Sequence, residues 1–315
     1  MSRLQYDAEF YELGATMIKA QGKLFPVSDG ISRRKGFEDF IRFAGGPRPL
    51  PDDVEMLVHA APALEGFKVE ILHFRKKDAH LEWPGPGIVH IHGGGYTCSN
   101  ASDYRYYSPS LAAYVSATGV PMLSVNYRLA PEHAFPVPLK DCWSALLEVH
   151  KHANRLSLDP KRIAMMGESA GGGLAAAVVI LARDRQLSPP LARQIPIYPM
   201  LDDRADKDTT SGLAIFDIED VVTVTPIAAP GRLQDFEGFD MFVREDVAYA
   251  QRFIEADIPT EIHIYQGVPH ALHRSNPPPR LNSPDGCNGK LGKFSLLKDQ
   301  TSFAIVASLA GTALH

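Results

Sequence analysis

The residues best suited to chemistry lie in one short motif, Gly167-Glu168-Ser169-Ala170-Gly171. A serine with glycine two positions away on each side is typical of a nucleophile held on a sharp turn between a strand and a helix. The surrounding sequence fits, because an apolar run at 162–166 precedes the motif and a stretch of small apolar residues at 172–181 follows it. The hydroxyl would then stand near the positive end of the helix. We therefore interpret Ser169 as a nucleophile rather than as part of an ordinary glycine-rich turn.

A second motif could supply the hydrogen-bond donors that such a nucleophile needs. His92-Gly93-Gly94-Gly95 follows the apolar run 88–91, which has the pattern of a buried strand. Glycines without side chains would let backbone N–H groups approach a substrate oxygen, and Ala170, directly after the serine, offers another N–H. A flexible turn is the alternative interpretation. The pattern favours an oxyanion hole, in which the loss of one donor lowers kcat by about 10²–10³.

The general base is expected among the twelve histidines. His270 follows a strand predicted at 260–265 and a Gln-Gly-Val-Pro turn, so it lies where a strand-end loop would meet the serine. His273 is the nearest alternative. His90 and His92 share one face of a strand and could suggest a metal, but no third ligand is spaced to join them. No metal site is therefore predicted.

The acid that orients the histidine should lie between positions 169 and 270, since the motif implies the order serine, acid, histidine. Asp240 is the preferred candidate, because it stands just before a helix predicted to begin near Arg244. Other carboxylates in the same interval stay open as alternatives: Asp202, Asp203, Asp235 and Glu237.

The periodicity of apolar residues predicts the elements that would position these side chains. Helices are expected at 7–20, 31–44, 108–118, 138–152, 172–181, 244–256 and 294–309. Strands are expected at 54–60, 67–74, 88–91, 121–126, 162–166, 193–198 and 260–265. Because strands alternate with helices, the sequence predicts an α/β fold with a mostly parallel central sheet and helices on both faces.

Composition indicates a globular protein long enough for a large α/β domain, with 315 residues of which 45% are hydrophobic and 22% charged. A formal net charge of −5 gives no electrostatic case for binding nucleic acid. The longest apolar run, 174–182, is too short to span a bilayer, and the N-terminal residues lack the apolar core of a secretion signal. Three scattered cysteines argue against a disulfide framework. A cytoplasmic location is therefore expected.

Several stretches together resemble the hormone-sensitive-lipase-like esterases, also called bacterial family IV, of the α/β-hydrolase fold-3 group. They are HGGG at 92–95, YRLAPEH at 127–133, LDPKRIAMMGESAGGG at 158–173, YPMLDD at 198–203 and GVPHA at 267–271. The resemblance covers most of residues 50–275 and is most specific up to Asp203.

The resemblance implies one α/β-hydrolase domain over residues 1–315, in which residues 1–48 and roughly 204–230 contribute to a helical cap over the pocket. It implies a serine carboxylesterase that hydrolyses small to medium acyl esters through an acyl-serine intermediate, with no cofactor and no metal. The family's catalytic triad would be Ser169, Asp240 and His270, and its oxyanion donors would be Gly94, Gly95 and Ala170. The expected partner is a small-molecule ester, and a homodimer stays open.

Two departures from the family pattern concern the region before the acid. The family has an apolar strand there, whereas residues 233–239 supply no convincing strand, and the segment 203–226 is short for the cap helices. We therefore expect one strand of the sheet to be missing or rearranged, which affects the placement of Asp240. Disabling the acid lowers kcat by about 10⁴. These departures suggest one alternative function, a ligand-binding protein of this fold with impaired catalysis. A separate alternative is a lactonase or acyltransferase of secondary metabolism on the same triad.

Overall fold

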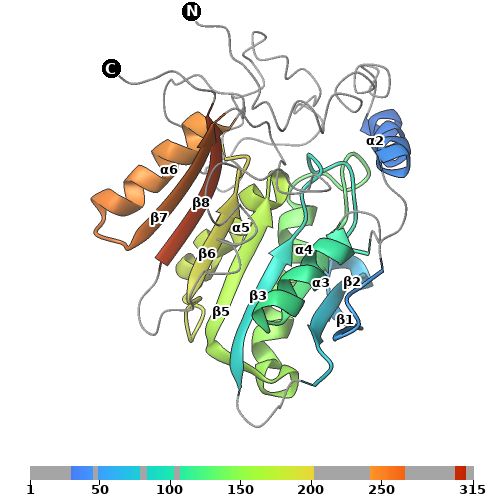
Figure 1. The fold of residues 1–315 in the computed structure, drawn as a ribbon, viewed down its shortest axis with the longest axis horizontal. Helices are drawn as coiled ribbons and strands as arrows, with labels where there is room; N and C mark the ends of the chain where they lie inside the picture. Colours follow the sequence, from blue (N-terminus) through green and yellow to red (C-terminus); the bar gives the residue numbers. More distant parts are fainter. Residues whose placement is uncertain are drawn as a thin grey trace, which may run out of the picture.

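A central sheet with helices on both sides organises the part of the chain that the computed structural model describes (Figure 1), which is residues 30–44, 49–78, 84–102, 107–201, 242–266 and 302–309. The strands are β1 (Val54–Pro62), β2 (Lys68–Lys76), β3 (Gly85–Ile91), β4 (Met122–Asn126), β5 (Leu158–Glu168), β6 (Arg193–Ile197), β7 (Thr260–Gln266) and β8 (Ser302–Leu309). The helices are α2 (Gly30–Ala44), α3 (Tyr107–Thr118), α4 (Val137–Lys151), α5 (Ala170–Asp184) and α6 (Val243–Glu255), with short 3₁₀ turns at Leu64–Gly66 and Ala153–Leu156. Within these ranges, no helix combines the length and the apolar character that crossing a membrane would need.

The sheet has eight strands in the order β1-β2-β4-β3-β5-β6-β8-β7. β2 pairs antiparallel with both of its neighbours, β1 and β4. The remaining pairings of the described strands, from β4 through β3, β5, β6 and β8 to β7, are parallel. The predicted α/β fold with a mostly parallel sheet is therefore confirmed. Because parallel strands end at the same edge, the residues that follow β3, β5 and β7 leave the sheet on one side.

Alternating side chains along the strands hold a helical layer on each face of the sheet. Ile71 and Leu72 of β2 are both buried, but Ile71 packs with residues of α4 and α5, whereas Leu72 packs with residues of α3. Burying one such side chain contributes about 1.5–3 kcal/mol. α6 joins the layer of α4 and α5, because its Tyr249 packs against Ala176 of α5.

The helix predicted at 294–309 is wrong over its second half, because Ser302–Leu309 forms the strand β8. Residues 294–301 lie outside the described part of the chain. The run 303–307, with the sequence FAIVA, is apolar throughout and contains two β-branched residues. Such a run suits a central parallel strand buried on both faces as well as it suits a helix. Pairing with the neighbouring strands β6 and β7 makes this run a strand.

β8 lies in the sheet between β6 and β7 (Figure 1). Its register pairs Ser302 with Arg193 of β6 and Leu309 with Gln266 of β7. The backbone groups on the inner edges of both neighbours thereby have a strand to bond to, which buried backbone requires. The last part of the chain thus provides the strand at this position of the sheet. The stretch 233–239, the helix expected at 7–20 and the cap segment 204–230 lie outside the described residues.

Candidate active site

Ser169 lies on the turn between the end of β5 and the start of α5, in a backbone conformation that a non-glycine residue rarely adopts (φ 53°, ψ −123°). Hydrogen bonds of its own peptide groups hold it there. Its N–H donates to the carbonyl of Ile197 over 3.0 Å, and its carbonyl accepts from the N–H of Gly173 at 3.1 Å and of Met200 at 2.9 Å. Strained backbone costs about 1–3 kcal/mol and persists only where the surrounding structure fixes it. The sharp turn predicted from the motif is therefore present.

The two glycines that flank the serine are required by close backbone contacts. A Cβ atom on Gly167 would lie 2.2 Å from the carbonyl oxygen of Gly171. A Cβ atom on Gly171 would lie 2.2 Å from the carbonyl oxygen of Ile91 and 2.4 Å from that of His92. No side chain fits at these distances. The first turn of α5 consequently rests directly on the start of the HGGG loop, so the two motifs found in the sequence are neighbours in space.

The HGGG loop takes conformations that favour glycine. Gly94 and Gly95 have positive φ angles of 119° and 59°, and a Cβ atom on Gly94 would lie 2.2 Å from the carbonyl oxygen of Cys98. The carbonyl of Gly94 accepts hydrogen bonds from the N–H groups of Thr97 at 3.1 Å and Cys98 at 2.8 Å. The loop therefore folds back as a tight turn at the carboxyl end of β3, beside the Ser169 turn.

Tyr127 fixes the residue with which this loop begins. The rings of Tyr127 and His92 stack with their centroids 4.3 Å apart and an interplanar angle of 14°. The hydroxyl of Tyr127 also donates a hydrogen bond of 3.0 Å to the carbonyl of His92. Both side chains are buried, at 3% and 0% exposure. Tyr127 belongs to the YRLAPEH motif, which thus supports the HGGG loop rather than forming a separate site.

Ala170 is the first residue of α5, and amide groups in the first turn of a helix have no carbonyl within the helix to bond. Its side chain packs in a buried cluster with Met200 and Phe242, which is 4% exposed. Phe242 directly precedes α6. The start of α6 therefore lies against the residue that follows Ser169.

A buried carboxylate fixes α6 in this place. Glu245, in the first turn of α6 and 5% exposed, accepts a hydrogen bond of 2.5 Å from the N–H of Leu201. Burial raises the pKa of the neighbouring Tyr96, and the negative charge of Glu245 raises it further, so the phenol of Tyr96 keeps its proton at neutral pH. Tyr96 directly follows the glycines of the HGGG loop. The loop, the Ser169 turn and α6 thus meet at one edge of the sheet.

A buried polar chain runs beneath the serine on the face of the sheet that α3 covers. His90 of β3 bonds Glu168 through Nε2 at 2.7 Å and Ser124 of β4 through Nδ1 at 2.8 Å. All three residues are at most 1% exposed. Sequence reasoning weighed His90 only as a metal ligand and missed this pair, although a buried glutamate next to Ser169 requires a partner. Among the described residues, no group of three or more metal-binding side chains could hold an ion.

The predicted site residues divide into two groups. The structure brings Ser169, Ala170 and the glycines Gly94 and Gly95 to the carboxyl ends of β5 and β3. The predicted acid and base, with their alternatives, lie outside the described residues: Asp240, Asp202, Asp203, Asp235 and Glu237, and His270 and His273. Their assignments stay predictions.

Known proteins share this architecture. A family model described as the alpha/beta hydrolase fold matches residues 88–226. The chain is 26% identical over 300 residues to an AB hydrolase superfamily protein of Schizosaccharomyces pombe, an alignment that covers 82% of this chain and 86% of that protein. It is 40% identical over 114 residues to the carboxylesterase NlhH of Mycobacterium tuberculosis, which covers 36% of this chain and 34% of that enzyme. Among solved structures, a bacterial heroin esterase superposes with a TM-score of 0.72 at 30% identity, covering 85% of this chain and 90% of that one.

Proposed function

This chain belongs to the hormone-sensitive-lipase-like esterases of the α/β-hydrolase fold, and we propose that it hydrolyses small to medium acyl esters with Ser169 as the nucleophile. The observation that carries the proposal is the contact between the strained Ser169 turn and the start of the HGGG loop, made through Gly171. A hydroxyl held clear of a strand end, beside backbone donors with no side chains, is the arrangement that acyl transfer needs.

In the proposed reaction, Ser169 Oγ attacks the carbonyl carbon of the ester while its proton passes to the imidazole of His270. The carbonyl oxygen gains the negative charge, and the N–H groups of Gly94, Gly95 and Ala170 would stabilise it. Each donor of this kind contributes about 10²–10³ to kcat. Collapse of the intermediate expels the alcohol, which takes the proton from the imidazolium, and leaves an acyl-serine. Water, activated by the same histidine, then releases the carboxylic acid.

Sequence distance supports Asp240 and His270 as the other members of the triad. Asp240 stands two residues before Phe242, which packs against Ala170, and two peptide units span at most about 7.6 Å. β7 runs parallel to β8, β6, β5 and β3 and ends at Gln266 on the edge of the sheet that carries Ser169. His270 follows four residues later, within about 14 Å of chain. These chain lengths are compatible with the proposed triad, in which Asp240 orients His270 and His270 accepts the proton of Ser169.

We also propose that residues 1–315 form one domain, with a cap contributed by residues 1–48 and roughly 204–230. The start of the described part of the N-terminal segment, α2, lies against the loops that follow β3 and β4, because a Cβ atom on Gly30 would lie 3.3 Å from Pro131 Cδ and 3.8 Å from Thr97 Cγ2. Such a cap would exclude water from the acyl pocket and select its substrates. A cytoplasmic location and a homodimer stay predictions.

Hydrolysis of p-nitrophenyl acetate, butyrate, hexanoate and octanoate tests this function. We expect release of p-nitrophenol by the parent protein, and a loss of kcat of at least about 10⁴ in Ser169→Ala. Ser116→Ala, which changes a serine at the far end of α3, is the matched control and should keep the parent's kcat. Equal activity of Ser169→Ala and its parent would remove Ser169 as the nucleophile. Saturable binding of the ester by the parent protein without any burst of product would favour a binding protein with impaired catalysis.

A further inference from the structure

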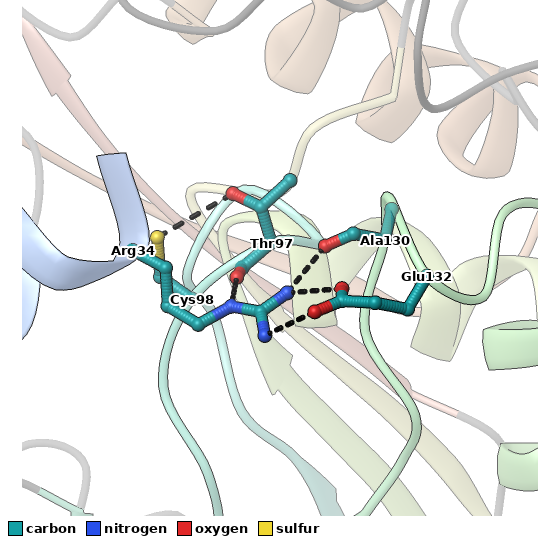
Figure 2. Close-up of polar contacts among 5 residues, drawn as sticks. All are labelled: Arg34, Thr97, Cys98, Ala130 and Glu132. Carbon is teal, nitrogen blue, oxygen red and sulfur yellow. Dashed lines mark hydrogen bonds and ion pairs between the residues drawn. The ribbon is translucent and has the colours of Figure 1, made fainter. Parts of the chain in front are cut away.

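Arg34 of α2 reaches across to two loops that lie far from it in the sequence (Figure 2). Its Nε donates a hydrogen bond of 2.6 Å to the carbonyl of Thr97, and its Nη2 donates one of 2.8 Å to the carbonyl of Ala130. Its two terminal nitrogens also donate a bidentate pair of hydrogen bonds, a fork, to the carboxylate oxygens of Glu132, at 2.9 Å and 2.6 Å. One guanidinium thus holds together the loop after β3 and the loop after β4.

The two carbonyls that Arg34 binds belong to residues tied directly to the HGGG loop. The N–H of Thr97 donates to the carbonyl of Gly94 at 3.1 Å, and the N–H of Ala130 donates to the carbonyl of Tyr96 at 3.0 Å. Thr97 and Ala130 therefore each bond Arg34 through their carbonyl and the loop through their N–H. A shift of the guanidinium would be passed on to the residues on either side of Gly95.

The hydrogen bonds from Arg34 to the carbonyls of Thr97 and Ala130 hold the two loops more firmly than its ion pair with Glu132 does. The side chains of Arg34 and Glu132 are 23% and 45% exposed, and solvent-exposed ion pairs contribute little on their own. The hydrogen bond from Arg34 lowers the pKa of Glu132, so the carboxylate stays charged and keeps the fork in place at neutral pH. The planar guanidinium can aim separate N–H groups at Thr97, Ala130 and Glu132 together, which the point charge of a lysine does not reproduce.

We propose that Arg34 is a positioning residue that holds the backbone of Gly94 and Gly95 in the orientation that stabilises the oxyanion, and so couples α2 to catalysis. This inference rests on the proposed function of the HGGG loop. Arg34 acts through Thr97 and Ala130 and does not itself touch the reacting atoms. Since an oxyanion hole acts on the transition state, loosening it should lower kcat and leave KM nearly unchanged.

The test compares Arg34→Met, Arg34→Lys and Glu132→Gln in the full chain with p-nitrophenyl butyrate. Because loss of a whole donor lowers kcat by about 10²–10³, we expect a smaller loss, about 10–100-fold, in Arg34→Met, with KM within about twofold of the parent. Arg34→Lys should lose about 3–10-fold, since it restores the charge but not the fork. Glu132→Gln should lose less than about threefold, because both carbonyl bonds remain.

The inhibition constant of a trifluoromethyl ketone distinguishes a role in the oxyanion hole from a merely structural role. Ser169 Oγ adds to the carbonyl carbon of the ketone while the hydroxyl proton passes to the imidazole of His270, the proposed base, and the oxygen of the tetrahedral adduct carries the negative charge. Its inhibition constant should rise in Arg34→Met by the same factor as kcat falls. Arg75→Met is the matched control, because Arg75 pairs with Glu55 at 2.8 Å and is similarly exposed, at 26%, but lies on β2 away from the loop.

Circular dichroism and urea unfolding establish that each variant is folded, and Arg34→Lys decides the question if Arg34→Met does not fold. The proposal is overturned if the folded variant keeps the parent's kcat, or if kcat falls while the inhibition constant stays unchanged. The proposed function is tested separately, since inactive Ser169→Ala beside fully active Arg34→Met would refute only the role of Arg34.

Discussion

Substituting alanine for Gly171 tests whether the contact between the serine turn and the HGGG loop sets the activity. The added Cβ would lie 2.2 Å from the carbonyl oxygen of Ile91 and 2.4 Å from that of His92, whereas ordinary contact begins near 3.4 Å. The start of α5 must therefore move away from the end of β3 by about 1 Å, because both neighbours are backbone and neither can rotate aside. Overpacking of this kind destabilises a protein by about 1–3 kcal/mol. A misplacement of about 1 Å between reacting groups lowers the rate by about 10²-fold.

The assay measures both quantities on the same samples, namely unfolding in urea and kcat for p-nitrophenyl butyrate. Gly85→Ala is the matched control, because a Cβ at that position meets nothing within 4 Å. It should leave kcat unchanged and stability equal or slightly higher. Parental kcat and parental stability in Gly171→Ala would refute the reasoning, since the measured contact would then have no consequence.

Two further predictions concern the rest of the sheet. A chain that ends at residue 301 lacks β8, which is in register with β7 over the whole of Thr260–Gln266. Each hydrogen bond between the two strands contributes about 1 kcal/mol, so the free energy lost with β8 is comparable to the whole free energy of unfolding of a typical domain, about 5–15 kcal/mol. The free energy of unfolding measured in urea and kcat should both fall sharply, and a peptide of residues 302–315 should restore part of each. Unchanged kcat in the truncated chain would contradict the assignment of β8. The second prediction concerns His73, which is 1% exposed and lies 3.2 Å from a ring nitrogen of His59. Burial is the main reason that its pKa is lowered to about 4. Between about pH 6.5 and pH 4 the unfolded chain therefore binds a proton at His73 that the folded chain does not bind. Stability should therefore fall by up to about 3 kcal/mol as the pH drops from 6.5 to 4, and His73→Leu should flatten this dependence in urea titrations; an unchanged pH profile in that variant would count against it.

Features set by nearby residues could be predicted from the sequence. The Ser169 turn depends on a strand, a glycine on each side and a small-residue helix, all of which lie between 162 and 181. The parallel sheet followed from the alternation of strands and helices, and it is confirmed. The close contact of Gly171 with the end of β3 gives a physical reason for the glycine of the motif that the motif alone did not state.

Features set by distant residues could not be predicted in the same way. The partners of Arg34 lie 63 to 98 residues further along the chain, and no local pattern marks an arginine on a helix as a partner for two backbone carbonyls. The strand β8 shows the same limit, because the run 302–309 fits a helix or a central strand equally well until its neighbours are known. The bond between His90 and Glu168 likewise joins residues 78 positions apart.

The position of β8 also separates two parts of the proposed mechanism. The proposed nucleophile and oxyanion donors lie at the ends of β3 and β5, which are neighbours in the centre of the sheet, and at the start of α5. The proposed acid precedes α6 and the proposed base follows β7, and the pairing that links β7 to the centre of the sheet runs through β8. Weakening β8 should therefore disturb the proposed acid and base first, because the hydrogen bonds of Ser169 go to Gly173, Ile197 and Met200, which belong to α5 and to the end of β6 and its following loop rather than to β7. A chain without β8 that remains folded in its centre would then retain the oxyanion donors but lose proton transfer, because the imidazole would no longer be held beside the hydroxyl.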